Sequence, residues 1–146
     1  MDGLFIAKYG GGLIMKKVLD LPLKAKWYEM IASGEKLEEY REIKPYWCNR
    51  LLGACPYGIK DYWTPVLQRT FQRVQELGRR FPEENLEHLL VWQYGVRNYT
   101  HVRFRYGYTR KTMTFEIKDI VIDEGKPEWG AEKGKKYFVI KLGRLI

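Results

Sequence analysis

The sequence predicts one α+β domain built on a small, mixed but mostly antiparallel, partly closed β-barrel with helices at its ends. The expected order is strand, helix, strand, a helical hairpin and then three strands that follow one another as a meander. A length of 146 residues suits one hydrophobic core. Hydrophobic residues make up 45% of the chain and aromatic residues 15%, which excludes a globally disordered protein.

The first 14 residues are expected to form a leader or tail outside the core. Residues 1–14 carry three consecutive glycines at 10–12 and no amphipathic period, so the domain is expected over 15–146. No apolar run approaches the length of a membrane span, and no signal-peptide pattern is present. The chain is therefore interpreted as a soluble, cytoplasmic protein with no membrane partner.

A first strand is expected at roughly 16–21, because the residues there alternate weakly between apolar and polar. Pro22 should end this strand or mark an edge of the sheet, since proline has no N–H for a strand ladder. A short helix should follow at about 24–33, and Gly34 is a good helix stop. One helical face carries the apolar side chains of Trp27, Met30 and Ile31.

The charged stretch SGEKLEEYREIKPYW, residues 33–47, is expected to form a strand. In a helix its glutamates would repel one another at i,i+4 spacing. In a strand, alternation places Leu37, Glu39 and Arg41 on one face and Lys36, Glu38 and Tyr40 on the other. Pro45 should then break the strand, and Tyr46 and Trp47 should pack the turn or line a pocket.

Residues 53–98 predict an inserted helical hairpin. Proline stands near the start of each expected helix, and glycine stands at its end. Cys48 and Cys55 are interpreted as free thiols, as is usual in a cytosolic protein. The cysteines and histidines have no zinc-site spacing, so neither a metal centre nor a cofactor is expected.

The remaining residues predict strands. Alternation over 99–122 predicts a β-hairpin with its turn at 107–111. Its two faces carry Val102, Phe104 and Tyr106 on one side, and His101, Arg103 and Arg105 on the other. The last strand should be central in the sheet, because the residues from Tyr137 to Ile140 are almost continuously apolar.

The net charge of +8 is unevenly distributed, and a localised excess points to a patch that faces a polyanion more than uniform basicity does; charge that only keeps the protein soluble is the alternative. Residues 99–118 hold five cations and one carboxylate, which is half of the excess. The candidate nucleic-acid-binding residues are Arg103, Arg105, Tyr108, Arg110 and Lys111. Cations for phosphates beside rings for base stacking are typical of single-stranded RNA binding. A solvated surface is the alternative for Arg103 and Arg105, and His101 on the same face is expected at the surface.

Lys36, Glu39 and Arg41 form the candidate ligand site, with Tyr46 and Trp47 as its wall. The guanidinium offers a planar fork of donors, the carboxylate accepts hydrogen bonds, and the ammonium adds a mobile cation. Such a set suits a ligand with an anionic part and a hydrogen-bonding edge, such as a nucleotide. The alternative is a surface strand whose ion pairs are satisfied.

These residues carry a resemblance to a known family. Gly34, Lys36, Glu39 and Arg41 match the G-x-K-x-x-E-x-R signature of ASCH domains, which belong to the PUA-like superfamily. The segments LPLKAKWYEMIASG, FRYGYTR, IKDI and YFVIKLGRLI resemble the strands and helix of that family. The resemblance covers 16–52 and 99–146, and implies a PUA-like β-barrel with a cleft beside the signature.

The resemblance also implies partners and an activity. The superfamily binds RNA and modified bases. Some bacterial relatives are amidohydrolases on acetylated cytidine and use the signature lysine with a threonine nucleophile. This chain has Glu39 at the threonine position, which cannot serve as a hydroxyl nucleophile. Another relative is a ribonuclease that relies on the signature lysine, which matches Lys36.

Three functions follow, in order of preference. The first is an RNA- or modified-nucleotide-binding domain that uses the signature cleft and the basic hairpin. The second is a small hydrolase acting on a modified nucleoside or on RNA, with Lys36 as its essential cation or base. The third is a protein-interaction domain that uses the helical hairpin at 64–95.

Overall fold

The structure is a computed structural model that describes residues 4–6, 13–52 and 97–146. The helical hairpin expected at about 53–98 lies outside the described residues, apart from its last two positions, and so does Cys55. Parts of the expected leader are described, and they form two short strands, β1 (Leu4–Ile6) and β2 (Leu13–Met15). These strands pair with each other in a small antiparallel sheet of their own. Regular structure was not expected there.

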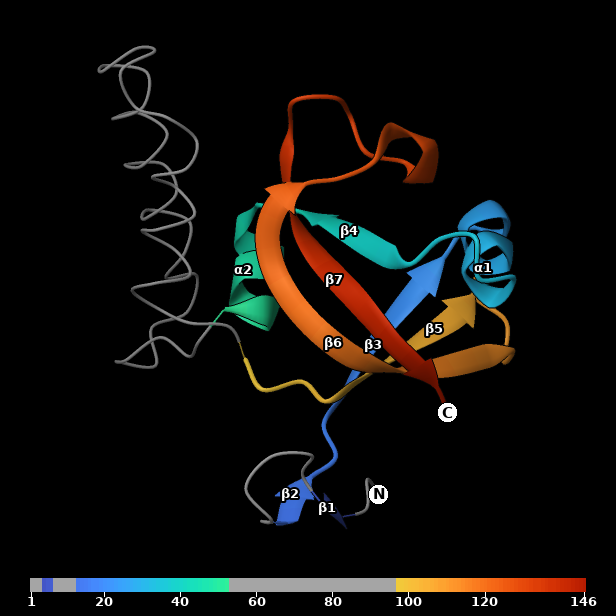
Figure 1. Ribbon diagram of the computed structural model, residues 1–146, viewed down its shortest axis with the longest axis vertical. Helices are drawn as coiled ribbons and strands as arrows, with labels where there is room; N and C mark the ends of the chain where they lie inside the picture. Colours follow the sequence, from blue (N-terminus) through green and yellow to red (C-terminus); the bar gives the residue numbers. More distant parts are fainter. Residues whose placement is uncertain (1–3, 7–12, 53–96) are drawn as a thin grey trace. The chain divides into compact units, whose positions relative to one another are not determined.

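The described residues have an α+β fold with one mixed, curled sheet of five strands in the order β3-β5-β6-β7-β4, a half-barrel (Figure 1). The strands are β3 (Val18–Leu23), β4 (Glu38–Glu42), β5 (His101–Tyr106), β6 (Thr112–Glu124) and β7 (Lys136–Leu145). The helices are α1 (Ala25–Ala32), α2 (Pro45–Leu51) and a 3-10 turn, Pro127–Trp129. The α+β class and a mixed sheet were both predicted, and β7 lies between two strands, as expected of a central strand.

Contacts within the chain define two compact units. The first comprises Met1–Glu39, Asn98–Asp119 and Ile140–Ile146, and the second comprises Tyr40–Arg97 and Ile120–Val139.

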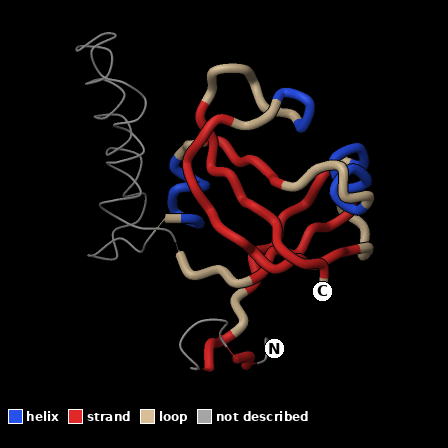
Figure 2. Tube along the Cα trace, in the orientation of Figure 1, coloured by secondary structure: helices blue, strands red, loops and turns tan. Residues whose placement is uncertain are grey.

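The first unit is built on the parallel pair β3 and β5, with α1 beside it (Figure 2). Alternate residues of β3 are buried, and Pro22 sits on this strand at the end of the strand order, as expected for proline at a sheet edge. In the antiparallel pair β5 and β6, Phe104 and Phe115 pack with ring centroids 6.1 Å apart. The predicted hairpin at 99–122 is thereby confirmed.

The helix α1 matches the expectation within one residue at each end. Tyr28 and Ile31, three positions apart, are its buried residues. Gly34 follows the helix with φ of 84°, a left-handed conformation that favours glycine. The chain then turns back, and the backbone N–H of Lys36 donates to the carbonyl of Met30 at 3.0 Å. The end of α1 therefore fixes the position of Lys36.

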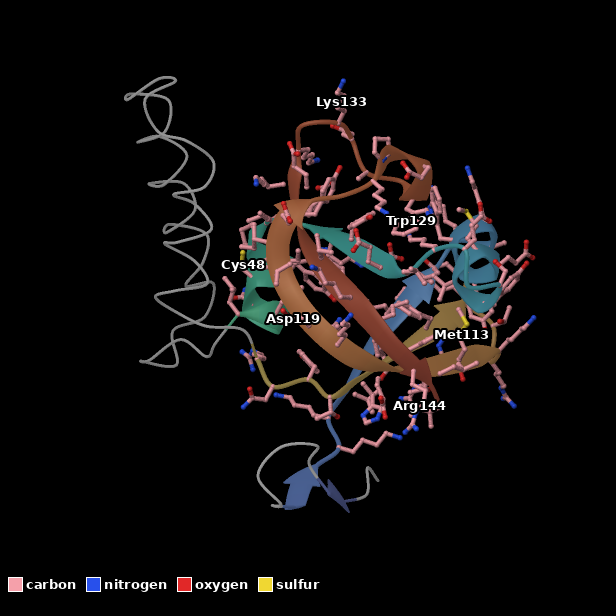
Figure 3. All side chains as sticks on the ribbon, in the orientation of Figure 1. Cys48, Met113, Asp119, Trp129, Lys133 and Arg144 are labelled. Carbon is pink, nitrogen blue, oxygen red and sulfur yellow. The ribbon has the colours of Figure 1, made fainter. Side chains whose placement is uncertain are left out.

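The second unit contains a helix that the sequence analysis missed. Pro45 was expected to break the chain into a turn, but it occupies the first turn of α2. The missing proline N–H costs nothing at that position, because the first N–H groups of a helix have no partner within it. Cys48 and Leu51 face inward from α2. Figure 3 shows Lys133 at the tip of the loop between β6 and β7, which also carries the buried Trp129.

Candidate functional site

The first candidate group surrounds Lys36, whose side chain is only 1% exposed. Its Nζ lies 2.9 Å from Oε1 of Glu39, which is also buried. The same Nζ lies 4.5 Å from the ring centroid of Trp27 on α1. Removing two charges from water costs several kcal/mol per ion, by order of magnitude. The ion pair and the contact with the indole both offset that cost.

The predicted alternation of faces is wrong before Glu38, because β4 begins only there. Lys36 therefore precedes the strand, and the turn after Gly34 brings it toward Glu39 at i,i+3 spacing. Leu37, which was expected on the face of Glu39, is instead 59% exposed. The alternative of a surface strand is also wrong for this pair, since both members are buried.

The second candidate group lies in the second unit, around Trp47. The guanidinium carbon of Arg41 lies 5.2 Å from the Trp47 ring centroid, and Nη1 of Arg41 donates to the Tyr40 carbonyl at 2.7 Å. The Tyr46 and Trp47 rings meet edge to face, with centroids 4.8 Å apart. Trp47 is half-buried, whereas Tyr46 is 58% exposed. The five predicted ligand-binding residues are thus found in two groups. Lys36 and Glu39 form the buried ion pair, and the other three, Arg41, Tyr46 and Trp47, form the second group.

Sequence reasoning missed Arg50, which belongs to the second group. Its guanidinium carbon lies 5.7 Å from the Tyr46 centroid and 5.6 Å from that of Trp47. Nη1 of Arg50 also donates to the Tyr46 hydroxyl at 3.0 Å. Reading Pro45 as the first residue of a helix would have found it, because Tyr46 and Arg50 are then four residues apart on one face.

The predicted nucleic-acid-binding residues are divided by their contacts. Arg103 donates from Nε and Nη2 to the two carboxylate oxygens of Asp20, at 2.6 and 3.0 Å. Arg105 donates from Nη1 to the Thr109 carbonyl at 3.0 Å. Register explains the first contact, because Asp20 and Arg103 are paired across the parallel strands β3 and β5. Both arginines are therefore engaged within the first unit.

The turn that follows β5 is the exposed part of this patch. We call residues 107–111 the basic turn. Tyr108 is 99% exposed, and Arg110 and Lys111 are exposed as well. Nζ of Lys111 lies 5.3 Å from the ring centroid of Tyr106. Tyr106 in turn packs edge to face against Tyr28 of α1, with centroids 5.1 Å apart.

The expectation of a surface position for His101 is wrong, because this side chain is buried. Its strand, β5, has a neighbour on either side in the sheet, β3 and β6. Nδ1 of His101 lies 2.8 Å from Oγ1 of Thr100, and that hydroxyl oxygen also accepts from the Lys17 backbone N–H at 2.8 Å. His101 is therefore part of the folded interior of the first unit.

Cys48 is a free, buried cysteine on α2. Burial raises the pKa of its thiol to about 12, so the thiol remains protonated at neutral pH and is a poor nucleophile. Within the described ranges, no group of three His, Cys, Asp or Glu side chains is placed to hold a metal ion. The helices in those ranges are all too short or too polar to cross a membrane.

No protein-family model matches this chain, and neither a curated protein nor a solved structure shows significant similarity to it. The resemblance to ASCH domains therefore depends on the signature positions Gly34, Lys36, Glu39 and Arg41 and on the segments that flank them.

Proposed function

We propose that this protein binds single-stranded RNA and that the basic turn is its principal contact. The observation that carries the proposal is the position of Tyr108, whose ring is 99% exposed beside the exposed cations Arg110 and Lys111. An aromatic ring in water offers its face to a nucleobase, and neighbouring cations attract the phosphates. Stacking does not depend on base identity, so we expect little sequence preference at this turn.

The internal hydrogen bonds of the turn support a binding role. The Thr109 hydroxyl donates to the Tyr106 carbonyl at 2.6 Å, and the Tyr106 N–H donates to the Lys111 carbonyl at 2.9 Å. Arg105 adds its bond to the Thr109 carbonyl. These bonds restrict the backbone that carries Tyr108, which reduces the entropy lost when RNA binds.

The proposal extends to the family and to the ligand site. We infer an ASCH-like member of the PUA-like superfamily from the signature, with a modified nucleotide as a second type of ligand. Lys36, Glu39, Arg41, Tyr46 and Trp47 are the proposed ligand-binding residues. An RNA partner also fits a cytoplasmic role.

Hydrolysis is the second candidate, and the buried pair of Lys36 and Glu39 favours it, because buried charges are often kept for a function. Lys36 is almost closed to solvent, however, so a substrate reaches its Nζ only after neighbouring side chains move. Binding at an exposed turn needs no such movement. This difference places RNA binding first.

Titration of a fluorescently labelled single-stranded RNA at several salt concentrations tests the proposal. Tyr108→Ala should weaken binding about 5- to 150-fold, the range expected for loss of one stacked base. Arg110→Gln should lower the salt slope by about 0.7 if it removes one phosphate contact. Arg144→Gln is the matched control, because Arg144 is an exposed arginine that pairs with Glu116.

Two results would overturn the proposal. One is the absence of measurable RNA affinity at low salt. The other is RNA affinity that the Tyr108 and Arg110 substitutions leave unchanged. For the hydrolase, the decisive measurement is turnover on a panel of nucleosides and RNAs, with its loss in a folded Lys36→Met variant.

A further inference from the structure

The helix α2 carries a cluster of aromatic and cationic side chains that consists of Tyr46, Trp47 and Arg50. Helical geometry brings them together, because Arg50 lies four residues after Tyr46 and three after Trp47. The guanidinium of Arg50 contacts both rings, and Arg41 from β4 approaches Trp47 as well. Arg50 is half-buried, and among the described residues it forms no ion pair with a carboxylate.

The contacts of Arg50 with the Tyr46 and Trp47 rings orient its guanidinium in a way that suits binding of an anion. A guanidinium that packs against rings keeps its edge of N–H donors for a second partner, and that edge matches the oxygens of a phosphate. The bond from Nη1 to the Tyr46 hydroxyl further restricts the side chain. Less rotamer entropy is therefore lost on binding. A second guanidinium, that of Arg41, adds positive charge at the same indole.

Tyr46 supplies the second half of the site. Its ring packs edge to face with Trp47, yet it remains 58% exposed. A tyrosine that packs against its neighbours and is still more than half exposed is available to stack on a nucleobase. A cation for one phosphate and a ring for one base together describe a single nucleotide.

We propose that Arg50 and Tyr46 form a nucleotide subsite on α2 that holds one residue of a bound RNA. Arg50 binds the phosphate, and the base stacks on Tyr46. The inference rests on the proposed RNA-binding function and adds to it a second contact region and a residue, Arg50, that neither the signature nor the basic turn includes. Charge complementarity favours a phosphate at Arg50, and the proposed function makes RNA the occupant that carries it.

The test uses the full chain and the labelled single-stranded RNA described above. Arg50→Gln should weaken binding about tenfold, the effect of losing charge-assisted hydrogen bonds, and should lower the salt slope by about 0.7. Arg50→Lys should keep the slope and regain only part of the affinity, because lysine lacks the planar fork. Tyr46→Leu should weaken binding by a similar factor and leave the slope unchanged.

A second measurement locates the base directly. An RNA that carries 5-iodouracil should cross-link to Tyr46 on irradiation, and peptide mass spectrometry identifies the site. Tyr46→Phe should keep this cross-link, because the ring is retained. Arg144→Gln is again the charge-matched control, and circular dichroism verifies that every variant is folded.

The outcomes separate this inference from the proposed function. If wild type binds RNA and only the Tyr108 and Arg110 variants are weakened, the α2 subsite is wrong and RNA binding stands. If wild type binds no RNA, both fail. Arg50-dependent binding of a poly-glutamate peptide, with none of RNA, would overturn the inference in favour of a protein partner.

Discussion

Replacement of Lys36 by methionine should destabilise the protein strongly. Methionine keeps the length of the apolar stem but removes the cation that faces the Glu39 carboxylate at 2.9 Å. Both side chains are buried, so water cannot readily replace the lost partner. The cation–π contact with Trp27 disappears in the same step.

The expected magnitude follows from the separation and the burial. At 2.9 Å and an effective dielectric constant of about 20, the attraction between two unit charges is about 6 kcal/mol, and the cost of removing both ions from water opposes it. Removal of one partner from a buried ion pair typically costs about 3–5 kcal/mol. With a shift of roughly 2–4 °C per kcal/mol for a chain of this size, the melting temperature should fall by about 6–20 °C.

Urea unfolding, followed by tryptophan fluorescence, measures this loss for Lys36→Met, for Glu39→Leu and for the double variant. The double variant removes both charges, so we expect it to recover to within about 1 kcal/mol of wild type or to exceed it. Trp27 lies beside the substituted position and is one of the five tryptophans that contribute to the signal.

Exposed ion pairs contribute less than about 1 kcal/mol to the free energy of unfolding. A loss below that value in Lys36→Met would therefore refute the reasoning from burial. A double variant as unstable as the single ones would refute it as well. The double variant also separates structure from function. If it folds and binds RNA and nucleotides as wild type does, Lys36 has a structural role only.

Three further predictions concern the arginines proposed to bind RNA, the buried thiol of Cys48 and the close packing at Gly125. Arg103→Gln should reduce RNA affinity less than Arg110→Gln in the same titration, because Arg103 already donates two hydrogen bonds to a carboxylate. Cys48 should react with a thiol reagent only after unfolding, because burial raises its pKa to about 12. The unfolding free energy should fall as pH rises from about 9 toward 12, since the unfolded thiol ionises first. Gly125→Ala should cost about 1–3 kcal/mol in urea unfolding, because a Cβ there would lie 2.6 Å from the Cβ of Ala131.

Each of these predictions has a control. Asp20→Asn removes the carboxylate that holds Arg103 and should increase the contribution of that arginine to RNA binding. A Cys55→Ser background leaves Cys48 as the only thiol, and Cys48→Ala should flatten the pH dependence between 9 and 12. Ala131→Gly should recover part of the loss in Gly125→Ala. Equal losses for the two arginines, rapid labelling of the native thiol or an unchanged unfolding free energy would contradict the respective prediction.

Local sequence patterns predicted most of the described elements. Apolar spacing and the stop at Gly34 gave α1 within one residue at each end. Period-two alternation identified the hairpin of β5 and β6, and the continuous apolar run from Tyr137 identified β7 as a central strand. These patterns succeed because each depends only on neighbouring residues and on which face they bury.

Local patterns did not predict α2 or the burial of Lys36 and His101. Proline reads equally well as a break or as the first residue of a helix, and only the chain that follows Pro45 distinguishes the two. Burial of Lys36 and His101 depends on elements distant in sequence or on a turn conformation. The charge pattern of residues 33–47 suggested a ligand site or a surface strand, but it could not show that Lys36 and Glu39 are buried as an ion pair.

Solvent access changes the relative weight of the candidate residues. The sequence assigns Lys36 to the candidate ligand site and the basic turn to a separate candidate contact with nucleic acid. In the structure Lys36 is enclosed by its ion pair and by Trp27, whereas Tyr108 is open to water. A ligand can reach the exposed Tyr108 ring without any rearrangement of the protein. A ligand reaches the Lys36 ammonium only after contacts of similar strength replace the ion pair with Glu39. Solvent access therefore favours the basic turn and α2 over Lys36 as the proposed contacts for RNA.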